Sequence, residues 1–262
     1  MTKKIRAVLL DLSGTVHEGP KVISGAVEAV SRLQREVSSV RVLTNTSTIS
    51  ALAMHQQLQE MGFSFSLNQI YTSVLAVKAY LMKHQLRPFC LLEDVSDFAP
   101  EIDIRPPHNA VVVGLAPSKF NYKSLDQAYQ ILQNGGELIA MHKSPFVKNA
   151  DGGKSLGPGP FVAALESAMN NSIQSTILGK PTKEFFLHSM PDGIDPSEVC
   201  MVGDDVQNDI IGAECSGIGR CILVKTGKYS EGDEAKANFP VILVPSIVEA
   251  ADWILEHNNQ LP

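Results

Sequence analysis

The chain has 262 residues, of which 44% are hydrophobic and 19% charged, so it can form one large domain or two modest ones with ordinary cores. Its 22 basic and 28 acidic residues give a net charge of −6 without a basic block. This balance argues against nucleic acid or an anionic membrane surface as the main partner. Apolar runs are too short to span a membrane, and the N-terminal residues do not resemble a signal peptide, so we expect a cytoplasmic protein.

Strands alternate with helices through the first eighty residues. The expected strands cover residues 5–10, 40–43 and 70–71, and the expected helices cover residues 26–37, 50–61 and 73–82. The first strand is almost continuously apolar, which is typical of a parallel strand that is buried on both faces. The alternation predicts a parallel sheet.

A second unit with strands and helices of its own is expected over residues 80–175. Its expected strands cover residues 89–92, 110–115 and 138–141, and its expected helices contain residues 125–132 and 161–168. Residues 144–160 are rich in glycine, proline and charge, and we expect them to form a loop that borders the entrance for the substrate. A plain surface loop is the alternative for this segment.

The chain then returns to the first sheet. Strands are expected over residues 175–178, 199–202 and 221–224, with helices around residues 185–190, 210–213 and 247–255. The predicted fold class is therefore α/β: a doubly wound, parallel, Rossmann-like core with an inserted α/β cap domain. Residues 1–79 and 176–262 would form the two halves of the core, and residues 80–175 the cap.

Polar residues follow several of these strands. Asp11 ends the first strand before a turn at Gly14, Thr44 and Asn45 end the second, and Asp204 and Asp205 end a later one. Lys180 lies in a tight turn, and Asp209 follows shortly after Asp205. Each motif alone is more often an ordinary turn or helix start. Together they suggest a ligand site, because ligands of open α/β sheets bind at the carboxyl edge.

The ordered set resembles the haloacid dehalogenase superfamily of phosphohydrolases that use an aspartate nucleophile. Within this superfamily the chain is similar to the branch that carries a large α/β cap between the second and third motifs, and the resemblance covers nearly the whole chain. The usual first motif is Asp-x-Asp-Gly-Thr, and this sequence has Ser13 at the second aspartate.

The resemblance implies a Mg²⁺-dependent phosphatase that forms an aspartyl-phosphate. Asp11 would be the nucleophile, assisted by Lys180, and the metal ligands would be Asp11, Asp204 and the backbone carbonyl of Ser13. Asp205 and Asp209 would orient metal waters or Lys180. The residues expected to contact the substrate phosphate are Asp11, Leu12, Ser13, Thr44, Asn45 and Lys180.

Ser13 limits the substrates. Serine cannot relay protons near neutral pH as the usual aspartate does, so good leaving groups are favoured. We expect a small phosphorylated substrate or phosphoamino acid with a P–N or pyrophosphate bond. The alternative is a catalytically weak phospho-ligand or phosphoprotein-binding module that retains the metal site. A homodimer through the cap is a further expectation, with no nucleic-acid or membrane partner.

Overall fold

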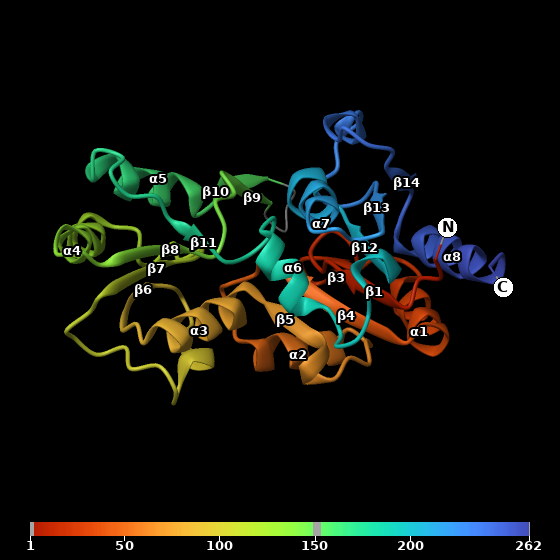
Figure 1. Ribbon diagram of the computed structural model, residues 1–262, viewed down its shortest axis with the longest axis horizontal. Coiled ribbons are helices and arrows are strands. Elements are labelled where there is room, and N and C mark those ends of the chain that lie inside the picture. Colours follow the sequence, from red (N-terminus) through yellow and green to blue (C-terminus); the bar gives the residue numbers. More distant parts are fainter. Residues whose placement is uncertain (1–2, 149–152, 262) are drawn as a thin grey trace. The chain divides into compact units, whose positions relative to one another are not determined.

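The structure, a computed structural model, describes residues 3–148 and 153–261 and divides into two compact units (Figure 1). The first unit contains Met1–Thr44, His55–Tyr71 and Lys180–Pro262, and the second contains Asn45–Met54 and Thr72–Gly179. Each unit has a sheet of its own.

A six-stranded sheet forms the centre of the first unit. Its strands follow one another across the sheet in the order β14 (Ile242–Val244), β13 (Arg220–Val224), β12 (Val199–Gly203), β1 (Ala7–Leu10), β4 (Ser39–Thr44) and β5 (Ile70–Thr72). From β14 to β4 the neighbours pair in parallel, and Leu10 lies opposite both Val202 and Val42. All four residues of β1 are buried, as expected for a strand covered on both faces.

Among the described residues, five helices belong wholly or partly to this unit. They are α1 (Ala26–Glu36), α2 (Ala51–Glu60), whose first residues belong to the second unit, α6 (Lys183–Ser189), α7 (Gly212–Cys215) and α8 (Ile247–Asn259). Helix α1 lies beside α8 (Figure 1), and α6 packs against α7. The buried residues of α1 recur every three or four positions, which gives the helix one apolar face.

Short helical turns occur in both units. In the first unit they are the 3₁₀ turns η1 (Leu67–Gln69), η3 (Pro196–Glu198) and η5 (Asp233–Lys236) and the π-helix η4 (Val206–Ile211), and in the second unit the 3₁₀ turn η2 (Ser96–Phe98). In the parts of the chain that the structure describes, no helix combines the length and the apolar character that a membrane crossing requires.

The second unit is built on a smaller parallel sheet. Its strands lie in the order β11 (Thr176–Ile177), β8 (Glu137–Ala140), β7 (Ala110–Val113) and β6 (Pro88–Leu91). Its helices are α3 (Ser73–His84), α4 (Tyr122–Gln133) and α5 (Gly159–Ala168).

The side chains of β7 enter two different hydrophobic clusters. Ala110 and Val112 pack with residues of α3, whereas Val111 and Val113 pack with residues of α4 and α5. Successive side chains of a strand point to opposite faces, so both faces of this sheet are covered. This arrangement explains why the strand has an uninterrupted apolar sequence.

The structure differs from the expectations in several places. The strand expected over residues 175–178 was assigned to the first sheet, but β11 pairs with β8 in the sheet of the second unit, because so short a strand does not show in its sequence which sheet it joins. Within the expected loop 144–160, β9 (Phe146–Lys148) and β10 (Lys154–Leu156) form an antiparallel pair, while residues 149–152 lie outside the described residues. A short hairpin of β2 (His17–Glu18) and β3 (Lys21–Val22) and the edge strand β14 were not predicted either. The role of residues 144–160 at a substrate entrance stays a prediction.

Helix α3 belongs to the second unit, although the sequence placed its first residues in the core. Its residues Val74, Val77 and Leu81 pack in the cluster that includes Val112 and Ile139, so the whole helix belongs there. An amphipathic pattern shows that a helix covers a sheet, but it does not show which sheet. The predicted domain limits at residues 80 and 175 stay a prediction.

Replacing Leu33 in α1 by alanine should lower the free energy of unfolding by about 2–5 kcal/mol, because the side chain is fully buried (0% exposed) and its loss leaves a cavity. Leu67→Ala is the matched control in the same unit, since this leucine is 45% exposed, and should cost less than about 1 kcal/mol. Chemical denaturation followed by circular dichroism measures both. Equal losses would contradict the packing of α1 on the first sheet.

Candidate active site

Polar residues from three neighbouring strands meet at one edge of the first sheet. Asp11 follows β1, Thr44 ends β4 and Asp204 follows β12. The chain leaves β1 towards β4 and leaves β12 in the opposite direction, towards β13. Such a reversal of strand order opens a crevice at the carboxyl ends of the strands, where ligands bind in open α/β sheets.

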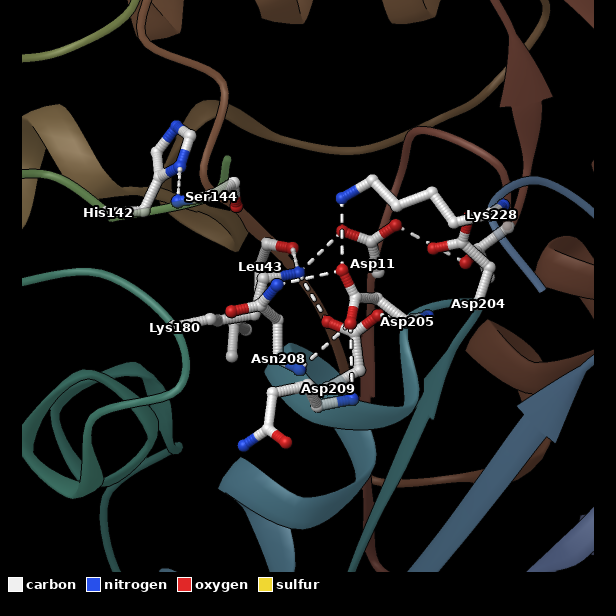
Figure 2. A network of polar contacts seen from close by, with 12 residues as sticks. Asp11, Leu43, His142, Ser144, Lys180, Asp204, Asp205, Asn208, Asp209 and Lys228 are labelled. Carbon is white, nitrogen blue, oxygen red and sulfur yellow. Dashed lines mark hydrogen bonds and ion pairs between the residues drawn. The ribbon is translucent and has the colours of Figure 1, made fainter. Parts of the chain in front are cut away.

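Lys180 lies at the centre of this group and is 3% exposed. Its Nζ donates to Asp11 Oδ1 at 2.5 Å, to Asp209 Oδ1 at 2.6 Å and to the carbonyl oxygen of Leu43 at 3.2 Å (Figure 2). Burial by itself disfavours the ammonium charge, but Asp11 and Asp209 outweigh it and raise the pKa of Lys180. The lysine is therefore a permanent buried cation between two carboxylates.

The carboxyl group of Asp204 is held by a backbone hydrogen bond and is closely packed against two glycines. The Lys228 backbone N–H donates to its Oδ2 at 2.6 Å. Gly14 and Gly227 lie against the same carboxyl group with φ of 96° and 62°, and a Cβ at either position would overlap it. Only glycine allows the loops after β1 and β13 to come this close.

Asp11, Asp204 and Asp209 each offer a carboxylate oxygen, and these oxygens lie within 4.8 Å of one another. Burial, together with the charges of Asp11 and Asp209, raises the pKa of Asp204 well above its usual value. Burial, followed by repulsion from Asp11 and Asp205, raises the pKa of Asp209 to about 7 despite the opposing effect of Lys180. A cation placed among these oxygens would relieve both effects.

The balance of charge also indicates a place for a bound cation. Four carboxylates, those of Asp11, Asp204, Asp205 and Asp209, lie close to two ammonium groups, those of Lys180 and Lys228. Two negative charges are therefore uncompensated when all six groups are ionised. Hard oxygen donors and this excess charge fit Mg²⁺.

Asp205 immediately precedes the π-helix η4, and Asp209 lies within it. The Asp205 carboxylate caps η4 by accepting from the backbone N–H groups of Gln207 and Asn208. Burial opposes its charge, but Lys228 and the hydrogen bonds from Asn208 hold the pKa of Asp205 below its usual value.

Both oxygens of Asp209 are already engaged. Oδ1 accepts from Lys180, and Oδ2 accepts from the Asp205 backbone N–H at 3.1 Å. The contact with Lys180 is the one that the predicted orienting role of Asp209 requires, and that role stays a prediction. The sequence could not show that a carboxylate oxygen of Asp209 also comes within 4.8 Å of those of Asp11 and Asp204.

The remaining predicted site residues are placed as follows. Leu12 is buried, and its carbonyl oxygen accepts from Thr15 and Val16 in the turn after β1, whereas the side chain of Ser13 is exposed. Thr44 is buried in the first unit. Asn45 belongs to the second unit, where its carbonyl oxygen accepts from Ser73 Oγ at 3.3 Å. Their contacts with a substrate stay predictions.

Sequence reasoning missed the loop after β13. Thr226 Oγ1 donates to the carbonyl oxygen of Gly14, Gly227 N–H donates to Glu18 Oε1 at 2.9 Å, and Lys228 Nζ forms an ion pair with Asp205 Oδ2 at 3.1 Å. Burial opposes the charge of Lys228, but Asp205, Asp204 and Asp11 raise its pKa. The available signal was the predicted strand 221–224 itself, because its carboxyl end lies beside that of β12.

Comparison with known proteins gives a consistent result. A model of haloacid dehalogenase-like hydrolases matches residues 8–101, and a HAD-hydrolase-like model matches residues 177–250. Haloacid dehalogenase-like hydrolase domain-containing protein 2 of Bos taurus is 42% identical over 259 residues, which cover 97% of this chain and 98% of the bovine protein. The chain belongs to the haloacid dehalogenase-like hydrolases.

Two further matches extend across almost the whole of this haloacid dehalogenase-like chain. Human phospholysine phosphohistidine inorganic pyrophosphate phosphatase is 34% identical over 265 residues, covering 98% of this chain and 96% of the human protein. The structure of a 4-nitrophenylphosphatase from Thermotoga maritima shares the fold with a TM-score of 0.85 at 24% identity, covering 95% of this chain and 97% of that one. The predicted family, fold class and hydrolase activity are thereby confirmed.

Mg²⁺ should raise the melting temperature of the parent protein, because it would bind the folded carboxylate cluster. Asp204→Asn should remove most of this shift and weaken Mg²⁺ binding at least about tenfold in calorimetry, since a charged ligand is lost. In chelator the variant should melt no lower than the parent, because an uncompensated buried charge has been removed. Asp192→Asn, at an exposed carboxylate, should keep the full Mg²⁺ response. Unchanged Mg²⁺ affinity in Asp204→Asn would contradict the assignment of this ligand.

Proposed function

We propose that this protein is a Mg²⁺-dependent phosphohydrolase in which Asp11 is the nucleophile and a covalent aspartyl-phosphate is the intermediate. The observation that carries the proposal is the buried Lys180 ammonium, which contacts both Asp11 and Asp209 in a carboxylate cluster that also contains Asp204. A phosphoryl-transfer site needs a positioned nucleophile and cations that neutralise the phosphate oxygens. Both requirements are met by these side chains together with a divalent ion.

Each residue of the site has a separate role in the reaction. Lys180 and Thr15 hydrogen-bond to the two carboxylate oxygens of Asp11 and orient the group. An oxygen of Asp11 forms a bond to phosphorus as the bond to the leaving group breaks, and water then hydrolyses the aspartyl-phosphate and restores Asp11. Bound Mg²⁺ would neutralise charge on Asp11 and on the phosphate, with Asp204 and the Ser13 carbonyl as further ligands. Asp209 holds Lys180 in place.

Ser13 points to the substrate class. Its exposed hydroxyl cannot deliver a proton near neutral pH, so a leaving group that needs protonation would depart slowly. Phosphoramidates that are already protonated on nitrogen, and pyrophosphate, do not need this help. The printed name of the human relative mentions phospholysine, phosphohistidine and inorganic pyrophosphate, which supports P–N or pyrophosphate bonds as the substrates of this chain.

The predicted partner is a small phosphorylated molecule or phosphoamino acid. A homodimer through the cap, a cytoplasmic location and the absence of nucleic-acid and membrane partners stay predictions.

Asp11→Asn should abolish turnover, because an amide is a poor nucleophile towards phosphorus. Beryllium fluoride with Mg²⁺ should form an acyl-phosphate mimic on the parent and not on the variant, which fluorine NMR can measure. Asp192→Asn is the control and should trap beryllium fluoride as the parent does. Turnover and trapping by Asp11→Asn at the parent level would remove the aspartate mechanism and leave the phospho-ligand-binding alternative.

Ser13→Asp should raise the turnover of alkyl and aryl phosphates, by up to the roughly 10²–10⁴-fold that general acid–base assistance supplies. The gain on pyrophosphate and phosphohistidine should be smaller, because their leaving groups depend less on protonation. Steady-state kinetics on this panel, at saturating Mg²⁺, measures the difference. Equal gains on every substrate would contradict the leaving-group argument while leaving the phosphohydrolase proposal in place.

A further inference from the structure

Lys228 places a second ammonium group beside the carboxylate cluster. Its backbone N–H is bound to Asp204, and its side chain extends across the cluster towards Asp205, with Nζ at 3.1 Å from Asp205 Oδ2 (Figure 2). Asp204 and Asp11 also lie close enough to act on its charge. Lys228 is thus positioned by the same residues that would hold the metal and the nucleophile.

The two lysines of the site differ in what they can still bind. The Lys180 side chain is 3% exposed and contacts two carboxylates, whereas the Lys228 side chain is 32% exposed and has one ion pair, with Asp205, among the described residues. An ammonium group has three N–H donors. Lys228 therefore has donors left for an anionic group that arrives from solvent.

The loop that carries Lys228 is also fastened to the turn that carries Ser13. Thr226 Oγ1 donates to the carbonyl oxygen of Gly14, the residue after Ser13, and Gly227 N–H donates to Glu18. Lys228 therefore lies on a loop that is hydrogen-bonded to the turn after β1. In that turn Ser13 stands where the family motif has its second aspartate.

We propose that Lys228 is a specificity-determining residue that contacts the leaving group of a diphosphate substrate and balances its negative charge, in place of the proton that Ser13 cannot supply. The inference rests on the proposed function and narrows it to P–O–P bonds. In the step concerned, Asp11 forms a bond to one phosphorus, the bond from this phosphorus to the bridging oxygen breaks, and the electron pair leaves with the second phosphate as an anion. Water then releases the first phosphate from Asp11, so no proton donor is needed for the departure.

The test compares Lys228→Met, which removes the charge at similar length, with Lys228→Arg, which keeps it. Lys225→Met is the matched control, because it removes the same charge from an exposed side chain of the same loop. In Lys228→Met, kcat/KM should fall at least about tenfold on pyrophosphate and less than about threefold on 4-nitrophenyl phosphate, since a charge-assisted contact to one leaving group is lost. Lys228→Arg should restore most of the loss, and Lys225→Met should match the parent on both substrates.

A second measurement does not depend on turnover. Calorimetry with Mg²⁺ and methylenediphosphonate, a non-hydrolysable diphosphate, should show binding at least about tenfold weaker in Lys228→Met, with orthophosphate binding unchanged. Thermal melting of each variant shows whether the fold is intact.

Equal losses on both substrates, or on both ligands, would overturn the specificity role, because Lys228 would then act on the shared phosphate or through Asp205. The absence of any loss would also overturn it. A parent protein that hydrolyses neither substrate would overturn the proposed function, whereas the methylenediphosphonate measurement would still decide whether Lys228 contacts a diphosphate.

Discussion

The contact of one buried ammonium with two buried carboxylates is the constraint on which the site depends. Lys180 has to lose its hydration to reach Asp11 and Asp209, and only the close carboxylates make this burial tolerable. Removing one partner of such a pair commonly costs about 3–5 kcal/mol, because the other charge stays buried. The parallel sheet makes the contact attainable, since it brings the ends of β1 and β12 side by side, where Lys180 reaches Asp11 and Asp209.

Much of this arrangement could be predicted from the sequence, for a physical reason. Strands buried on both faces have continuous apolar runs, so the ends of β1, β4 and β12 were visible, and with them Asp11, Thr44 and Asp204. Strand β14 has three residues and lies between two prolines, which obscures the pattern. The place of Asp209 depends on the π-helical geometry of η4, which periodicity does not reveal.

Lys228 is a site residue that the sequence alone does not reveal. A lysine after a Thr-Gly pair usually extends into solvent, and nothing in the local sequence marks it as part of a site. Its position follows from the parallel pairing of β13 with β12 and from the glycines that let its loop approach Asp204. Ser13 stood out because it departs from a known motif, but the contact of the Lys228 ammonium with Asp205 could be found only in three dimensions.

The division of the chain has a consequence for the order in which the protein is made. During synthesis Asp11 is made before residues 72–179 of the second unit, whereas Lys180, Asp204 and Lys228 are made after them. Domains generally fold as units as the chain leaves the ribosome. The second unit can therefore fold first. At that stage Asp11 is solvated and lacks its contact with Lys180, which has not yet been made. The first sheet can close only after β12 and β13 have been made, so a nascent chain arrested before β12 lacks Asp204 and Asp209 and carries no complete site.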